Sequence, residues 1–309
     1  MNQKTLKRKL LGIRGNDGWL FKAGLYLVLT GIGFIFLYPL LQMIATSFMP
    51  LIDLINPTVI WIPREPTWQN YARAFEALNV WSALRDSLVV SLVPTFAVLI
   101  SSALIGYGFA MFRFPFKRLL FTVLLLGFLI PTILTAIPTY VIYRELGLLD
   151  SLGAFAYPAL TGFGLRQTIF ILIFYQFFRS IPKPLIEAAE VDGAGEFRIF
   201  LRIAVPMTLP AFLISGLYAF VWYWNETNMA LLYFPERYST LPMAVIGFRT
   251  LYESLFPSGT VGLEGASEMF NQGVQFAGTL LSVLPLLIVY FIAQKWFIEG
   301  VDRSGIAGN

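Results

Sequence analysis

Long stretches without a charged residue alternate with shorter polar segments along the chain. Five of these stretches are long enough to cross a hydrocarbon layer of ~30 Å as helices that rise ~1.5 Å per residue. The pattern therefore predicts an all-α polytopic membrane protein. The five predicted spans are Gly24–Phe48, Ser87–Phe112, Leu119–Tyr143, Met207–Asn225 and Gly273–Gln294.

A sixth predicted span contains an arginine. The uncharged run Gln167–Phe178 is too short to cross alone, so we expect this helix to begin near Ala156 and to carry Arg166 inside it. An arginine at that depth costs about 3 kcal/mol unless it faces protein or water. Two interpretations stay open: Arg166 lines a cavity, or the helix is bent or unwound around Gly162 and Gly164 and Arg166 lies at the outer interface.

The composition also indicates lipid as the solvent. Hydrophobic residues make up 57% of the 309 residues, charged residues make up 13%, and the mean hydropathy is +0.70, whereas about a quarter of a soluble domain is charged. The chain has no Cys and no His, which excludes disulfides, thiolate chemistry and imidazole chemistry. We therefore expect no catalytic residue and no metal site.

The distribution of Lys and Arg predicts the orientation. With the N-terminus inside, fifteen of the twenty-two fall in cytoplasmic segments, and the long outer segments 49–86 and 231–272 carry fewer. Six spans return the C-terminus to the cytoplasm. Because the cations lie between spans, the net charge of +4 indicates no nucleic-acid partner. The fifteen are Lys4, Lys7, Arg8, Lys9, Arg14, Lys22, Arg113, Lys117, Arg118, Arg179, Lys183, Arg198, Arg202, Lys295 and Arg303.

The first outer segment is expected to contain a short amphipathic helix capped by Thr67. One face of that helix carries Trp68, Tyr71, Phe75 and Leu78. Packing alone explains this face at least as well as contact with a partner does. In the second outer segment the turn-rich residues 257–265 predict a loop.

The inner segment 179–206 is expected to form a helix, a glycine turn and a second helix. The first helix covers Leu185–Val191, and Gly193 stands where a helix C-cap needs a positive φ. The second helix is expected over residues 196–204 and should end before Pro206.

The first of these two helices has the surface of a docking element. Ala188 and Ala189 leave the backbone accessible to a partner, while Glu187, Glu190 and Asp192 supply hydrogen-bond acceptors. Taken alone, such a segment is more often an ordinary interfacial loop than a docking site.

The same segment resembles the EAA motif of ABC importer permeases: Glu-Ala-Ala, three residues, Gly, nine residues and Ile-x-Leu-Pro. Glu187-Ala188-Ala189, Gly193 and Ile203-Ala204-Val205-Pro206 match at every spacing, with Val205 in place of the usual Leu. The resemblance runs from Trp19 onward, although the tail lacks the usual terminal Lys-Gly. Flanking segments similar to the maltose-type carbohydrate-uptake branch are Thr67 with Asn70-Tyr71, Gly106–Ala110 leading to Arg113-Phe114, Gly147–Asp150 and Trp224-Asn225-Glu226.

The resemblance implies a type I ABC importer permease fold. Its parts would be a basic cytoplasmic segment 1–23, a six-helix transmembrane domain 24–299 and a cytoplasmic tail 300–309. The implied protein lies in the bacterial cytoplasmic (inner) membrane and forms half of the pathway for a mono- or oligosaccharide. A permease for a polyamine, a peptide or phosphate is the alternative. The implied ATPase-docking residues are Glu187, Ala188, Ala189, Asp192, Gly193, Ile203 and Pro206.

The chain is expected to depend on partner chains for energy. No Lys follows a Gly, so the chain contains no P-loop and is not itself an ATPase of that kind. The resemblance implies a second permease subunit, two ABC ATPase subunits that bind ATP and Mg²⁺, and an extracytoplasmic solute-binding protein. It implies no cofactor in this chain.

Candidate substrate-pathway residues lie on two of the predicted spans. A guanidinium suits sugar hydroxyls or, more sharply, a carboxylate such as that of a uronate, and aromatic rings stack on the C–H faces of sugars. For Trp222 and Trp224, however, an interfacial aromatic belt is the favoured interpretation. The candidates are Arg166, Tyr218, Trp222, Asn225 and Glu226.

Two other classes of protein fit less well. A secondary transporter should show internal repeats or intramembrane carboxylates, but no repeat is evident and acids such as Glu226 only border the predicted spans. A polytopic membrane enzyme would need clustered acids, metal ligands or a nucleophile with a base, and no such constellation is present.

Overall fold

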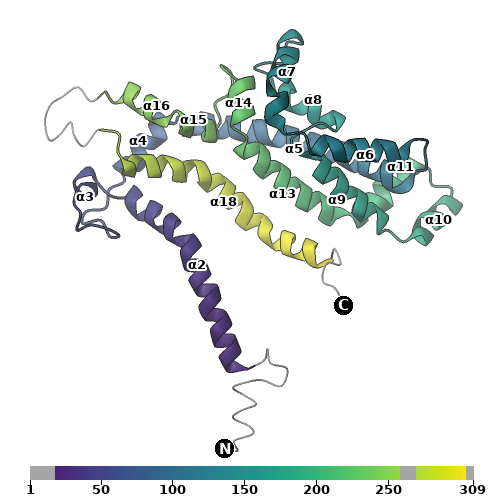
Figure 1. Ribbon diagram of the computed structural model, residues 1–309, viewed down its shortest axis with the longest axis horizontal. Helices are drawn as coiled ribbons and strands as arrows, with labels where there is room; N and C mark the ends of the chain where they lie inside the picture. The colour runs from purple at the N-terminus through teal and green to yellow at the C-terminus, as the bar shows by residue number, and fades with distance from the viewer. Residues whose placement is uncertain (1–17, 258–268, 304–309) are drawn as a thin grey trace, which may run out of the picture. The chain divides into compact units, whose positions relative to one another are not determined.

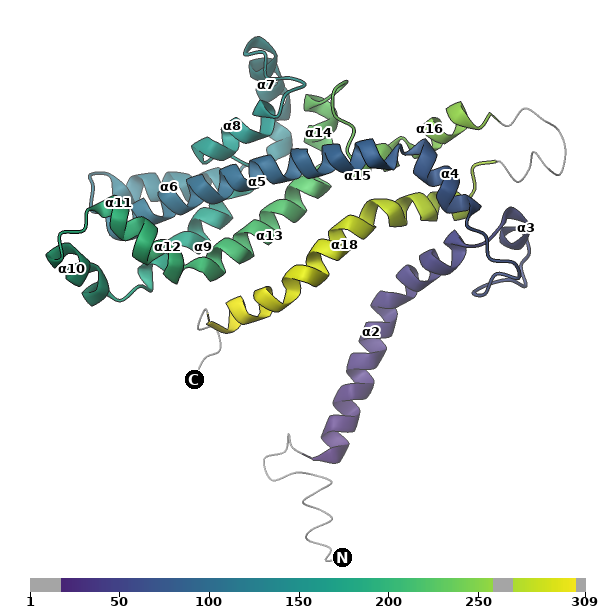
Figure 2. The same ribbon diagram turned by 180° about the vertical axis from the view of Figure 1, so that it is seen from behind.

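The computed structural model describes residues 18–257 and 269–303, and within them it contains helices and no strand. The chain divides into two compact units: residues up to Ala74 with 252–280, and residues 75–251 with those from Leu281 onward. The basic segment before residue 18, residues 258–265 of the predicted loop at 257–265, and the tail after residue 303 lie outside the described residues. Figures 1 and 2 show the helices from two opposite sides.

The first unit begins with the long helix α2 (Trp19–Ser47), which confirms the first predicted span. After α3 (Leu51–Leu54) the chain enters α4 (Gln69–Ala77), whose first residues belong to this unit. The Thr67 hydroxyl accepts a hydrogen bond from the Gln69 amide at 3.1 Å, so the predicted cap is confirmed.

Asn70 ties the end of α2 to the start of α4. Its buried side-chain amide donates to the carbonyl oxygens of Ser47 and Met49, at 2.9 Å each. The Tyr71 hydroxyl lies 2.8 Å from the Ser47 hydroxyl. The Asn70-Tyr71 pair therefore joins α2 to α4.

The second unit is built around α5 (Val80–Met111), which confirms the second predicted span. At Gly106 an added Cβ would lie 2.7 Å from the Phe174 Cβ, so the backbones of α5 and its neighbour approach closely. The helices packed along α5 are α8 (Gly153–Thr161), α9 (Gln167–Arg179), α13 (Leu209–Asn225) and α15 (Leu241–Ile246) (Figure 2).

Two clusters of buried side chains fill this second unit. One surrounds Phe155, Phe170 and Tyr223, and the other surrounds Tyr107 and Phe178. The second cluster contains Phe200, which follows the glycine turn of the inner segment, and therefore anchors that segment to α5 and α9.

The third predicted span is not one straight helix. It consists of α6 (Lys117–Phe128) and α7 (Thr132–Glu145), whose axes differ by 102°. Pro131 stands at the corner with an extended backbone, and proline disfavours a helical conformation in the residue before it.

The number of spans depends on how bent pairs are counted. Within the described residues, α2, α5 and residues 272–295 of α18 (Gln272–Arg303) are each long and apolar enough to cross a membrane, and up to six spans result if each bent helix pair counts as one. After α13 the chain also forms short helices that hydropathy did not predict, namely α14 (Asn228–Tyr233), α15 and α16 (Phe248–Leu255).

Candidate functional site: a docking loop and an arginine-edged cavity

The inner segment 179–206, here called the docking loop, begins with α10 (Lys183–Val191). This helix lies at one end of the second unit in both Figure 1 and Figure 2 and contains no buried residue. Glu187, Ala188 and Asp192 are exposed, and Ala189 is half-buried. The predicted first helix is confirmed, with two more residues at its start.

The glycine turn after α10 is a Schellman motif. Gly193 has a φ of 75°, its amide donates to the Glu190 carbonyl at 3.0 Å, and the Ala194 amide donates to the Ala189 carbonyl at 2.9 Å. Both bonds satisfy carbonyls that the end of a helix would leave unpaired. The predicted C-cap at Gly193 is therefore confirmed.

The sequence predicted that the second helix of the docking loop ends before Pro206, and this prediction is wrong. The helix runs as α11 (Glu196–Ile199), a π-turn η1 (Phe200–Ala204) and α12 (Val205–Met207). Pro206 lies in α12 directly after the π-helix, near the end of the continuous helical stretch Glu196–Met207. The break comes at Thr208, and the next helix, α13, departs at 75°.

Apolar side chains project from the docking loop on both sides of the glycine turn. Val191 is 88% exposed and Phe197 is 70% exposed, whereas Ile199 and Phe200 are buried. Of the other predicted docking residues, Ile203 is half-buried and Pro206 is exposed. The loop thus combines a buried base with a protruding surface that carries both carboxylates and apolar groups.

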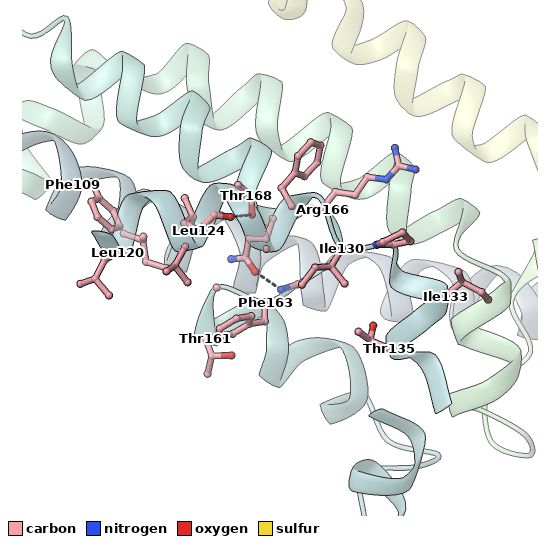
Figure 3. A pocket seen from close by; sticks show the side chains of 18 residues that line it. Phe109, Leu120, Leu124, Ile130, Ile133, Thr135, Thr161, Phe163, Arg166 and Thr168 are labelled. Atoms are coloured by element: carbon pink, nitrogen blue, oxygen red, sulfur yellow. Dashed lines mark hydrogen bonds between the residues drawn. The ribbon is translucent and has the colours of Figure 1, made fainter. Parts of the chain in front are cut away.

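A cavity of about 870 Å³ lies in the second unit between α5, α6, the α6–α7 corner and the segment that joins α8 to α9. Its lining is mostly apolar, with Thr161, Thr168 and Arg166 among the polar members. Figure 3 shows Arg166 at the edge of this cavity, with its side chain extending away from Thr161 and Phe163.

The prediction of one continuous helix from about Ala156 to Phe178, with Arg166 inside it, is wrong. α8 ends at Thr161, α9 begins at Gln167, and Gly162 and Arg166 between them have φ values of 90° and 49°. Of the two interpretations left open, the structure shows the unwound segment, and it also places Arg166 at the cavity.

Two buried side chains hold this unwound segment. The Gln167 side chain, 1% exposed, accepts a hydrogen bond from the Gly164 amide at 2.6 Å and donates to the Ala159 carbonyl at 2.8 Å. The Tyr223 hydroxyl accepts from the Leu165 amide at 3.1 Å. Sequence reasoning missed both residues; Gln167 looked like the first residue of an uncharged run.

The predicted pathway residues separate into two groups. The Arg166 guanidinium lies 5.3 Å from the Trp222 ring centroid, and Tyr218 lies 6.0 Å from the same ring, so these three are brought together. Asn225 and Glu226 instead make local backbone contacts, to the Val221 carbonyl at 2.8 Å and the Met229 amide at 3.0 Å respectively.

Trp224 fits neither interpretation offered for it. It is 3% exposed within this chain, and its ring lies 5.6 Å from that of Phe220. A buried ring of this kind is a core residue, not part of an interfacial belt or of a sugar-stacking surface. Hydropathy could not separate it from Trp222, which stands two residues earlier.

Among the described residues, three helices are long and apolar enough to cross a membrane, and α10 protrudes with no buried residue. Residues 99–303 match the family model described as the binding-protein-dependent transport system inner membrane component, and the chain belongs to this family. It is therefore a permease of an ABC importer and not the ATPase itself. The resemblance stated from the sequence is confirmed.

Individual proteins agree with this assignment. A protein from Caldicellulosiruptor sp. (strain Rt8B.4), whose name proposes an ABC transporter permease, is 32% identical over 272 residues, which cover 87% of this chain and 91% of the relative. The arabinooligosaccharides transport system permease protein AraQ of Halalkalibacterium halodurans is 28% identical, covering 90% and 93% of the two chains.

A solved structure shares the fold. It is a bacterial ABC transporter involved in the import of the acidic polysaccharide alginate, and it covers 90% of this chain and 96% of its own chain with a TM-score of 0.73. The sequences are 21% identical, so the likeness concerns the fold.

Proposed function

We propose that this chain forms half of the translocation pathway of a saccharide importer in the bacterial cytoplasmic membrane. The observation that carries the proposal is the docking loop, in which Glu187 and Ala188 stand exposed on α10 and the helix ends in a Schellman turn. A second permease subunit would complete the pathway, an extracytoplasmic solute-binding protein would deliver the sugar, and two ATPase subunits would bind ATP and Mg²⁺.

The proposed topology has six crossings with both termini in the cytoplasm. The bent pair α6–α7 and the broken pair α8–α9 would each make one crossing, because α9 alone spans only about 20 Å at ~1.5 Å per residue. The transmembrane domain would then occupy residues 24–299, with the docking loop on the cytoplasmic side, 1–23 and 300–309 as cytoplasmic ends, and 49–86 and 231–272 outside.

Coupling would run through the docking loop as a rigid-body motion. When partner ATPases close on ATP, they would shift α10, and the buried base at Ile199 and Phe200 would pass that shift to the bundle. The acceptors of Glu187 and Asp192 suit basic side chains or amides on such a partner.

The substrate is proposed to be a saccharide. One relative named for arabinooligosaccharides aligns over 90% of this chain, and Tyr218, Trp222 and Arg166 place two rings and one guanidinium on the same side of the unit. Asn225 and Glu226 would affect substrate binding only indirectly, through the backbone groups to which their side chains bond. A polyamine, a peptide or phosphate remains the alternative substrate.

The test is to purify the chain with its co-expressed partners and to measure ATP hydrolysis with solute-binding protein loaded with different saccharides. We expect one saccharide class to stimulate hydrolysis. Stimulation by a polyamine, a peptide or phosphate in place of every saccharide would reject the proposed substrate and keep the importer.

The docking role has its own test in Glu187→Lys and Gly193→Pro. Both changes are expected to uncouple or disassemble the complex while membrane insertion stays normal. Glu76→Lys, a charge reversal at another exposed glutamate on α4, is the control and should retain coupling. Wild-type transport in both docking variants would overturn the assignment of the loop.

A further inference from the structure

Arg166 is an exposed cation that pairs with no carboxylate in the part of the chain that the structure describes. Within residues 18–257 and 269–303 no ion pair is formed by its guanidinium, whose contact is with the Trp222 ring at 5.3 Å. A guanidinium has five N–H donors, and a ring face satisfies none of them as a carboxylate would. The charge is therefore available to a ligand.

The backbone presents this charge in one fixed way. Arg166 has a left-handed φ of 49°, a conformation that is unfavourable for a residue other than glycine. The hydrogen bonds from Gly164 to Gln167 and from Leu165 to Tyr223 hold the turn that requires it. Since a Cβ at position 164 would lie 2.7 Å from the Gln167 side-chain oxygen, the turn is also closely packed.

Aromatic rings make the surface beside the guanidinium. Trp222 lies 5.1 Å from Phe170 and 6.0 Å from Tyr218, measured between ring centroids, and Tyr218 is exposed. Rings of this kind stack on the C–H faces of sugars, while an arginine binds a carboxylate through two parallel hydrogen bonds. A uronic acid carries both features in one residue.

We propose that Arg166, Trp222 and Tyr218 form a subsite for the carboxylate-bearing sugar of an anionic oligosaccharide, with Tyr223 as the residue that positions Arg166. The inference rests on the proposed saccharide function and deepens it. The two rings contact the sugar face, the guanidinium pairs with the carboxylate, and the Tyr223 hydroxyl holds the backbone turn through Leu165.

The experiment measures uptake by the full importer in proteoliposomes with its solute-binding protein. The probes are trigalacturonate and the same trisaccharide with its carboxyl groups reduced to alcohols. The wild type is expected to prefer the acidic probe, and Arg166→Ala should reduce that preference by about tenfold, because a hydrogen bond to a charged group contributes about 1.5 kcal/mol or more. Arg166→Lys should retain part of it.

A matched control is Arg237→Ala. Arg237 also lies over a ring, 5.6 Å from the Tyr238 centroid, but does not line the cavity, so its loss should leave the preference unchanged. Tyr223→Phe should lower the preference in the wild-type background and should have no further effect in Arg166→Ala. An equal effect in both backgrounds would assign Tyr223 to packing alone and overturn the positioning role.

The outcomes separate this inference from the function on which it rests. Equal uptake of both probes by the wild type, or an unchanged preference in a well-folded Arg166→Ala importer, rejects the anionic subsite and leaves a saccharide importer. Uptake of neither probe, combined with ATP hydrolysis stimulated by a polyamine, a peptide or phosphate, rejects the saccharide function and the subsite together.

Discussion

The amide nitrogen of Ala194 lies 2.9 Å from the carbonyl oxygen of Ala189, and this hydrogen bond closes the end of the docking helix. It forms only because Gly193, between the two residues, takes a φ of 75°. The orientation of the chain that leaves α10 therefore depends on one residue without a side chain.

Replacing Gly193 with Ala should weaken coupling without preventing assembly of the helices in the membrane. A Cβ at this φ costs roughly 1–2 kcal/mol, which corresponds to a fivefold or greater loss of the correctly closed turn. We expect transport to fall by about that factor, measured as substrate uptake per importer. Gly195→Ala is the control, because Gly195 has an ordinary φ of −72° and should tolerate the change. Similar losses in both variants would contradict the role given to the turn.

Charging the exposed tip of the docking loop should release the ATPase subunits. Val191 is 88% exposed and apolar, so a partner surface that covers it would have to desolvate the ammonium of Val191→Lys. We expect less ATPase to co-purify with this variant. Ile62→Lys, at a residue that is 83% exposed in the proposed outer segment, should not reduce the yield of ATPase.

Widening the close approach of α5 and α9 at Gly106 should destabilise the second unit. In Gly106→Ala the new Cβ would lie 2.7 Å from the Phe174 Cβ and 3.0 Å from the Tyr175 backbone nitrogen, so one helix must shift. A loss of about 1–3 kcal/mol in unfolding free energy is expected, measured by thermal unfolding of the purified chain in detergent. Gly108→Ala meets no atom within 4 Å and should be neutral; equal stability of the two variants would show that α9 moves without cost.

The Asp150 carboxylate should control the order of the chain after α14. One of its oxygens accepts hydrogen bonds from the amides of Glu236 and Arg237, at 3.0 and 3.1 Å. In Asp150→Ala these amides should exchange with deuterium about tenfold faster or more, because charge-assisted bonds of roughly 1.5 kcal/mol each are lost. Asp150→Asn keeps an acceptor oxygen and tolerates the left-handed φ of 53° at this position. In this variant the amides of Glu236 and Arg237 should therefore exchange more slowly than in Asp150→Ala.

The sequence predicted those parts of the fold that depend on local patterns. The hydrophobic runs located α2, α5 and α18, the hydroxyl of Thr67 located the start of α4, and the spacing around Gly193 located the turn of the docking loop. Each of these features is set by residues within a few positions of one another.

The features that the sequence did not settle depend partly on residues distant in the chain. The sequence left unwinding around Gly162 and Gly164 open as one of two interpretations, but it could not show that the Tyr223 hydroxyl accepts from the Leu165 amide 58 residues away, or that the Gln167 side chain donates to Ser102 on α5. Likewise, Trp224 is buried whereas Tyr218, on the same apolar helix α13, is exposed, and hydropathy does not separate the two. Pro206 misled the prediction because the helical stretch Glu196–Met207 continues through it, directly after a π-helix.

The corner at Thr208 has a geometric consequence. The stretch Glu196–Met207 and the helix Leu209–Asn225 meet at 75°, and the buried Thr208 hydroxyl donates to the Ala204 carbonyl at 2.8 Å. Because the two helices meet nearly at right angles, a displacement along the axis of the first helix moves the second helix sideways and shifts it little along its own axis.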